Sequence, residues 1–240
     1  MLRNEWLKLR TIRSPWLLLA VTQVLIVVGA SGLLARWDTV DADAATRAVA
    51  HVGLLSLAPL LLGIMAVAGE YRHQTITATF LSVPRRGRVV GAKLAVYGAA
   101  GLGFGVLGTA TALATTGVWL GIKGGSVDLG YADLWRTVAG DVVWNVLFAL
   151  IGVALGALVR NLVAAIGVAL AWLALVEGLL GEVLGDRLGR WLPFQAGSAL
   201  GDLPNVHNGL PQWGAGLVLA GYAAVFVAVG LFLTQRRDVA

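Results

Sequence analysis

Six long apolar runs, separated by polar connections, limit this 240-residue chain to one kind of fold. A helix that crosses a bilayer needs about 20 mostly apolar residues. Runs of about this length occupy residues 16–35, 52–69, 94–119, 142–159, 162–180 and 214–233. Only 13% of the residues are charged, about half the share found in soluble domains. The sequence therefore predicts an all-α integral membrane protein with six transmembrane helices, residues 1–240 forming one domain.

The first run also has a second interpretation, a cleaved signal peptide, because basic residues precede it. The run is longer than a usual signal sequence, and no convincing cleavage site follows it. We therefore count it as a transmembrane helix.

Two further segments are expected to be helical. Residues 1–15 place most apolar side chains on one helical face, although Glu5 and Leu7 depart from the pattern. An interfacial helix is expected there, with a plain basic flank as the alternative. Residues 181–213 contain Gly and Pro around an apolar middle. They fit short re-entrant helices before the last span, or an amphipathic surface loop.

Lysine and arginine are unevenly distributed between the two sides of the membrane. Twelve belong to the N-terminus, residues 70–93, the turn at 160–161 and the C-terminus, and six to the alternate connections. Cytoplasmic segments carry the excess of such residues, so both termini are expected in the cytoplasm. The formal charge of +5 lies beside apolar runs. It fits anionic lipid headgroups and does not indicate a nucleic-acid partner.

The connection at residues 70–93, EYRHQTITATFLSVPRRGRVVGAK, is strongly basic. Residues 75–82 can form a short helix that Pro84 closes, because the residue before a proline avoids the α region. Its apolar residues are spaced to share one face: Ile76, Phe80 and Leu81. A cationic loop that holds an amphipathic helix suits docking to a soluble partner.

Glu70 ends the second span, where an acid opposes the helix dipole. It is expected to need a compensating partner, with Arg72, Arg85 and Arg86 as candidates. The alternative is a simple exposed charge at the helix end.

Three polar residues near the ends of the fourth and fifth spans are candidates for a substrate path: Asp141, Asn145 and Glu177. Ionisable groups within membrane segments are functional candidates by default. A helix cap or a position at the water interface explains them equally well.

Catalytic signatures are missing from the sequence. It contains no cysteine, three separated histidines and no G-x-x-x-x-G-K-[ST] motif, so no ATP hydrolysis by this chain is expected. Residues 103–108 match G-x-G-x-x-G, but the motif lies inside an apolar run rather than at a strand-to-helix turn. Its glycines, like the pairs Gly101/Gly105, Gly117/Gly121 and Gly152/Gly156, are expected to serve close helix packing.

The segment GEYRHQTITATFLSVPRRGRVVGAK resembles the cytoplasmic loop of ABC type-2 transporter permeases, especially the six-span actinobacterial kind. This chain departs from the family pattern at Gln74, where glycine is favoured, and at Ala78, where proline is common. LPFQAGSAL at residues 192–200 is also similar to a family segment.

The resemblance implies a permease subunit of the bacterial plasma membrane that works with a separate cytoplasmic ABC ATPase and a second permease chain. ATP and Mg²⁺ are expected on the ATPase, and no cofactor on this chain. Export of a hydrophobic or amphipathic compound (drug, lipid or peptide) is implied. The alternative is a non-transporting relative with an immunity, signalling or structural role. The residues expected to couple to the ATPase are Glu70, Tyr71, Arg72, His73, Thr75, Ile76, Thr79, Phe80, Leu81, Pro84, Arg85 and Arg86.

Overall fold

The computed structural model describes residues 1–36, 43–83, 85–203 and 209–236, and within these ranges all regular structure is helical. Six helical segments of the described chain are long and apolar enough to cross a membrane, which confirms the predicted fold class. They are α2 (Arg13–Ala35), α3 (Ala44–Leu54) with α4 (Leu57–Arg72), α6 (Arg86–Ile122), α7 (Ala132–Val159), α8 (Leu162–Ala171) with the π-helix η1 (Trp172–Leu180), and α11 (Gln212–Arg236).

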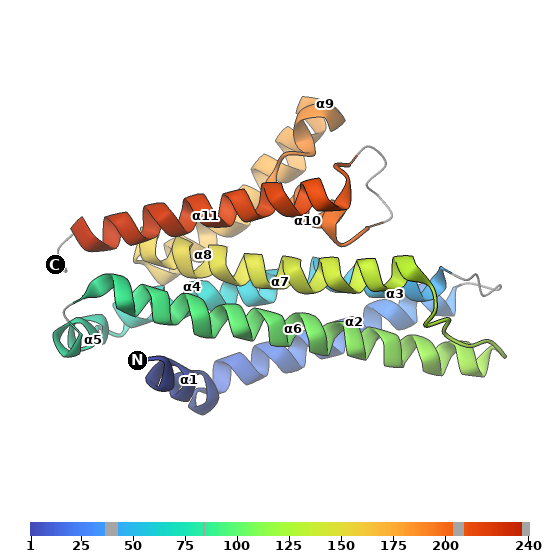
Figure 1. Ribbon diagram of the computed structural model, residues 1–240, viewed down its shortest axis with the longest axis horizontal. Coiled ribbons are helices and arrows are strands. Elements are labelled where there is room, and N and C mark those ends of the chain that lie inside the picture. The colour runs from blue at the N-terminus through green and yellow to red at the C-terminus, as the bar shows by residue number, and fades with distance from the viewer. Residues whose placement is uncertain (37–42, 84, 204–208, 237–240) are drawn as a thin grey trace.

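Four shorter helices of the described chain are α1 (Leu2–Thr11), α5 (Ile76–Ser82), α9 (Gly181–Gly189) and α10 (Pro193–Leu200). Helix α9 projects away from the bundle, and the other three lie at its two ends (Figure 1). Helices α1 and α5 lie at the same end as the C-terminus of α11, which we call the α5 end. Helix α10 and the start of α3 lie at the opposite end, the α10 end.

Three spans begin well before the positions that the hydropathy of the sequence indicates. The second begins at Ala44 rather than residue 52, the third at Arg86 rather than residue 94, and the fourth at Ala132 rather than residue 142. The added residues include charged side chains, which lower the hydropathy of a window without opposing helix formation. Consequently Arg86, Arg88 and Lys93 belong to helix α6, and the connection between α4 and α6 is shorter than expected.

The second span breaks between α3 and α4, at Leu55 and Ser56. Pro59 lies four residues after Leu55 and has no N–H with which to bond the Leu55 carbonyl, so the helix cannot continue unbroken. The break divides this span into α3 and α4.

Helix α7 is the central helix of the bundle, with α3, α4, α6, α10 and α11 packed around it. Glycines let the neighbouring backbones approach closely. A Cβ on Gly152 would overlap the carbonyl of Leu60 in α4, and one on Gly156 would lie 2.8 Å from the Ile64 carbonyl oxygen. Glycine at these positions therefore sets the distance between α4 and α7.

The same packing explains most of the glycine pattern in α6. A Cβ on Gly101 would lie 2.7 Å from the Asn145 carbonyl oxygen, and one on Gly105 would lie 2.8 Å from the Cα of Val142. The expected packing role is confirmed for these residues. It is wrong for Gly103 and Gly121, where a Cβ would meet no atom within 4 Å.

Helix α2 runs along α6, and polar contacts join the two helices at three levels. The Thr111 hydroxyl donates to Gln23 Oε1 at 2.6 Å, the Trp119 indole to Ser31 Oγ at 3.0 Å, and Lys123 Nζ to the Leu34 carbonyl at 2.6 Å. Such bonds hold helices together in an apolar environment, where hydrophobic burial alone gives no preference.

Candidate functional site

Helix α4 ends in a Schellman turn at the α5 end. The Thr75 N–H donates to the Glu70 carbonyl at 3.0 Å, and the Gln74 N–H donates to the Tyr71 carbonyl at 3.2 Å. These two bonds define the motif, in which the residue at the position of Gln74 adopts a left-handed conformation. Gln74 has φ of 56°, a value that favours glycine. The glycine expected from the resemblance thus matches the backbone, and the turn forms here with glutamine.

We expect Gln74→Gly to raise the stability of the protein by about 1 kcal/mol, because a Cβ in the left-handed region costs roughly that amount. The thermal unfolding midpoint of the purified protein in detergent measures the change. Gln74→Ala keeps the Cβ and should match the wild type. A glycine variant no more stable than the alanine variant would show that the turn stores no strain.

Helix α5 follows this turn and presents two different faces. Ile76 is 4% exposed and packs against the bundle, whereas Leu81 is 79% exposed. Phe80 is half-buried, with the Arg86 guanidinium 5.5 Å from its ring centre. The expectation that these three apolar residues share one face is wrong for Leu81. Five positions separate it from Ile76, which places it about 140° around the helix.

Lys93 is the centre of a buried ion network beneath α5. Its ammonium group, 1% exposed, donates to Glu5 Oε2 at 2.9 Å, Glu70 Oε1 at 2.7 Å and the Ala66 carbonyl at 2.8 Å. An ammonium group has three N–H donors, and each has an acceptor here. The burial of this charge is therefore matched by a full set of charge-assisted hydrogen bonds.

Lys8 completes the network. Its Nζ lies 2.9 Å from Glu5 Oε1 and 2.7 Å from Glu70 Oε1. Two lysines and two glutamates thus balance one another in a four-residue ion network (Glu5, Lys8, Glu70 and Lys93). Because its members come from α1, α4 and α6, the network joins the N-terminal helix to two membrane-spanning helices.

The pKa of Lys8 reflects both its partial burial and its contacts with the two glutamates. Partial burial lowers the pKa of this ammonium, but hydrogen bonds and attraction from Glu70 and Glu5 outweigh that effect and raise the pKa above its ordinary value. Since the raised pKa belongs to the folded state, the stabilisation from Lys8 is fully present at neutral pH. It is lost only as the pH rises through the folded-state pKa.

The partners of Glu70 differ from those expected. Arg72 and Arg85 are exposed, and Arg86 lies over Phe80. Lys8 and Lys93 hold the Glu70 carboxylate instead. Lys8 belongs to α1, far from Glu70 in the sequence, and Lys93 lies two turns into α6. Only the tertiary structure brings these two lysines close to Glu70.

The position of Glu5 on the apolar side of the N-terminal helix indicates a buried counter-ion. Glu5 departs from the amphipathic pattern of residues 1–15, and in the structure it is 2% exposed. An acid on the inner face of a helix needs a buried counter-ion. That requirement would have pointed to a lysine or arginine in one of the spans.

Thr79 connects α5 to the ion network. Its hydroxyl lies 3.3 Å from Glu70 Oε2, within hydrogen-bonding distance. The side chain of Glu70 therefore contacts α5 as well as α1 and α6, while its backbone closes α4.

The remaining residues expected at this site surround α5. Tyr71 lies under the Arg160 guanidinium, 5.5 Å from ring centre to Cζ. His73 and Thr75 are exposed, like the two arginines 72 and 85. Pro84 lies outside the described residues.

A cavity of about 670 Å³ separates α5 from α1 and α4. Its lining includes the apolar residues Leu62, Met65 and Tyr97 and the polar residues Glu5, Lys8, Glu70 and Thr79. Helix α5 therefore has open space on one side. A short helix with few packing contacts can shift at low cost.

The three residues expected along a substrate path lie in two separate places near the α10 end. Asp141 and Asn145 are both buried in α7, where the Asn145 amide donates to the Asp141 carbonyl at 2.8 Å. The Glu177 carboxylate, in η1, accepts hydrogen bonds from the Phe194 N–H at 2.8 Å and the Gln195 N–H at 3.0 Å. Glu177 is thus a cap for the first turn of α10.

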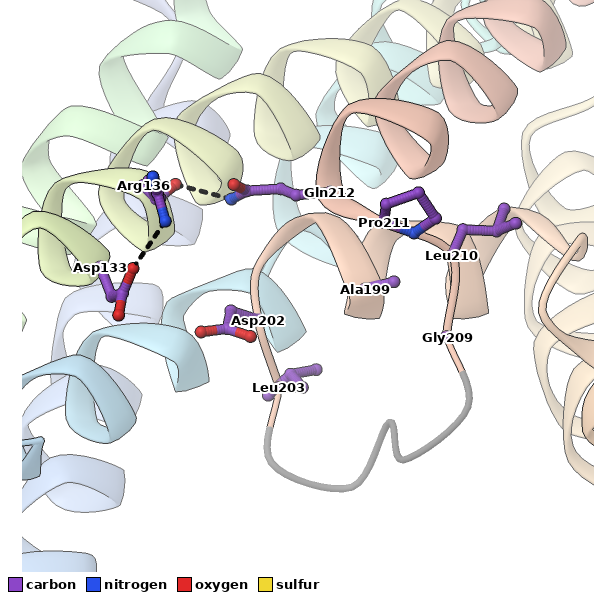
Figure 2. A pocket seen from close by; sticks show the side chains of 9 residues that line it. All are labelled: Asp133, Arg136, Ala199, Asp202, Leu203, Gly209, Leu210, Pro211 and Gln212. Atoms are coloured by element: carbon purple, nitrogen blue, oxygen red, sulfur yellow. Dashed lines mark hydrogen bonds and ion pairs between the residues drawn. The ribbon is translucent and has the colours of Figure 1, made fainter.

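A second cavity, of about 450 Å³, lies at this end between α7, the end of α10 and the start of α11 (Figure 2). Asp133 pairs with Arg136 at 2.9 Å, and Gln212 Nε2 donates to the carbonyls of Arg136 and Leu200 at 2.8 and 2.9 Å. Gln212 therefore fixes α11 to α7 and α10. Asp202 lies on the segment that leaves α10.

Across the part of the chain that the structure describes, no group of three or more His, Cys, Asp or Glu side chains is placed to hold a metal ion. The charged groups of the α5 end form ion pairs between helices.

These features define a multi-pass helical membrane protein in which a short exposed helix is tied to the spans by buried charges. A family model described as ABC-2 family transporter protein matches residues 1–175, from α1 into η1. The chain belongs to the ABC-2 family of transporter proteins. Members of this family are membrane components rather than enzymes, and association with an ABC ATPase goes with the family. No curated protein matches the sequence.

Proposed function

We propose that this chain is the membrane-spanning permease subunit of an ABC exporter in the bacterial plasma membrane. Its α5 end faces the cytoplasm, in agreement with the excess of lysine and arginine at that end. A separate ATPase binds ATP and Mg²⁺ and docks on α5. A hydrophobic or amphipathic compound is the cargo, since the buried side chains of the bundle are mainly apolar.

The observation that carries this proposal is the connection between α5 and the spans. Leu81 extends from the exposed face of α5, where a partner can bury it. Thr79, on the other side, contacts Glu70, which Lys93 and Lys8 tie to α6 and α1. A movement of the ATPase that shifts α5 therefore reaches three helices through one carboxylate.

Two permease chains, identical or paired with a sister chain, enclose the transport path in this proposal. Few residues are buried in the apolar windows of α2, of α8 with η1, and of α11, where the buried shares are 22%, 17% and 17%. These apolar faces are available to lipid or to the second chain.

Docking and coupling are tested by two variants that change opposite faces of α5. Leu81→Asp places a charge at the proposed contact and should reduce co-purification of the ATPase at least about tenfold, since burial of a leucine contributes about 2 kcal/mol. Thr79→Val should leave co-purification intact but lower ATP-dependent transport several-fold in proteoliposomes, because the contact with Glu70 is lost.

Matched controls separate these effects from general damage. Leu129 is 58% exposed in the connection between α6 and α7, so Leu129→Asp should not affect co-purification. Thr116 donates only within α6, to the Ala112 carbonyl, so Thr116→Val should keep transport. Normal transport in both α5 variants would argue against the coupling role. Failure of the wild type to bind any ATPase would favour a non-transporting relative.

A further inference from the structure

Asp141 is a buried acid that has no counter-ion among the described residues. Its side chain is fully buried in α7, and neither carboxylate oxygen accepts a hydrogen bond of standard geometry from the described residues. Buried charged groups in proteins are normally paired, and a buried polar atom without a partner calls for an explanation. The ion pairs at the α5 end show how this chain balances buried charge elsewhere.

Trp144, one turn further along α7, lies beside Asp141 in a narrow slot. Its indole N–H also has no acceptor among the described residues, although the ring is fully buried. A Cβ on Gly53 of α3 would lie 2.6 Å from Asp141 Oδ1 and 2.5 Å from Trp144 Cε3. A Cβ on Gly201, just after α10, would lie 2.5 Å from the same oxygen. Glycines on both sides therefore allow the backbone to approach the acid and the ring.

Two phenylalanines complete an aromatic group around Trp144. The Trp144 ring centre lies 5.8 Å from that of Phe148 and 5.3 Å from that of Phe194 in α10, both with edge-to-face geometry. The centres of Phe148 and Phe194 are 6.4 Å apart. Aromatic faces beside a carboxylate form the environment that proteins use to bind organic cations.

A polar row on one face of α7 leads from the cavity at the α10 end to this acid. Asp133 and Asp202 line the cavity (Figure 2). The Thr137 hydroxyl, four residues after Asp133, lies 3.5 Å from Asp202 Oδ2. Asp141 follows after four more residues, on the same helical face. The row offers acidic groups to a cation that enters from the cavity when α10 moves aside.

We propose that Asp141, together with Trp144, Phe148 and Phe194, is a recognition site for lipophilic organic cations. The carboxylate balances the charge and the rings contact the apolar substituents. Helix α10 covers the site in the conformation described here. This inference rests on the proposed export function and names a substrate class for it.

The test uses tetraphenylphosphonium as the probe and the full chain in lipid nanodiscs, without an ATPase. We expect saturable binding to the wild type by equilibrium dialysis, and binding at least about tenfold weaker to Asp141→Asn, which keeps the shape of the side chain but not its charge. Neutral triphenylphosphine oxide should bind the wild type more weakly than the cation. It should bind the wild type and Asp141→Asn equally.

Two further variants check the assignment. Asp128→Asn changes an exposed acid outside this row, in the connection between α6 and α7, and should bind the cation with at most a two- to threefold loss. Phe194→Leu removes a ring and should weaken binding even if Asp141→Asn proves hard to purify. Equal affinity of Asp141→Asn and wild type, equal binding of the cation and the neutral probe, or unchanged binding in Phe194→Leu would each overturn the proposal.

Transport by the complex with the ATPase is measured in parallel with a neutral amphipathic compound. Transport of this compound without cation binding would overturn the recognition site alone. Cation binding at Asp141 without any ATP-driven transport would count against the proposed export function alone.

Discussion

Replacement of Lys93 by methionine is expected to destabilise the protein by about 3–5 kcal/mol, the usual effect of breaking a buried ion pair. Methionine fills the space of the lysine stem, so the loss comes from charge. Glu5 and Glu70 would share Lys8 alone, and the Ala66 carbonyl would lose the hydrogen bond from Lys93. The thermal unfolding midpoint in detergent measures the effect.

A second substitution shows whether charge balance is the cause. Adding Glu5→Gln to Lys93→Met leaves one glutamate paired with one lysine, so the double variant should recover a large part of the lost stability. Arg88→Met, at an exposed position of α6, is the control and should change stability little. If the double variant were less stable than Lys93→Met, the ion network would not account for the loss.

Gly152→Val is expected to have the other large effect, because it places a branched side chain where α4 and α7 meet. Even the Cβ would overlap the carbonyl of Leu60, and a backbone atom cannot rotate away as a side chain can. The two helices must separate, and an overpacked contact of this kind costs about 1–3 kcal/mol or more. We expect a lower unfolding midpoint and a several-fold lower yield of folded protein.

Gly103→Val is the matched control for this substitution. Gly103 lies in α6, within the G-x-G-x-x-G pattern, and a Cβ there would meet no atom within 4 Å. The variant should therefore fold as well as the wild type. Equal losses in the two variants would point to helix propensity rather than to the contact between α4 and α7.

The number of spans and the position of the short helix after Glu70 were predictable, because both depend on local properties of the sequence. Long apolar runs define the spans, and turn residues flank residues 75–82. The start of α3 at Ala44 was missed because polar and charged residues precede the apolar run. The break at Pro59 was equally hidden, since a proline in an apolar segment can kink a helix or begin one.

The partners of the site residues were less predictable. The pairing of Lys93 with Glu5 joins residues 88 positions apart, and only the packing of α1 against α6 brings them together. Asp141 and Glu177 look alike in the sequence, as acids near the ends of spans. The structure separates them, because backbone N–H groups of α10 face Glu177, whereas Asp141 faces glycines and an indole ring.

The length of α6 has a mechanical consequence. A helix of 37 residues is about 55 Å long at 1.5 Å per residue, well beyond the hydrocarbon thickness of about 30 Å. It begins next to α5 and ends at the opposite side of the bundle, in the connection to α7 (Figure 1). If it pivots at one end, a tilt of about 5° displaces the other end by about 5 Å, given that length, so small rotations beside the ion network become displacements of atomic size across the bilayer.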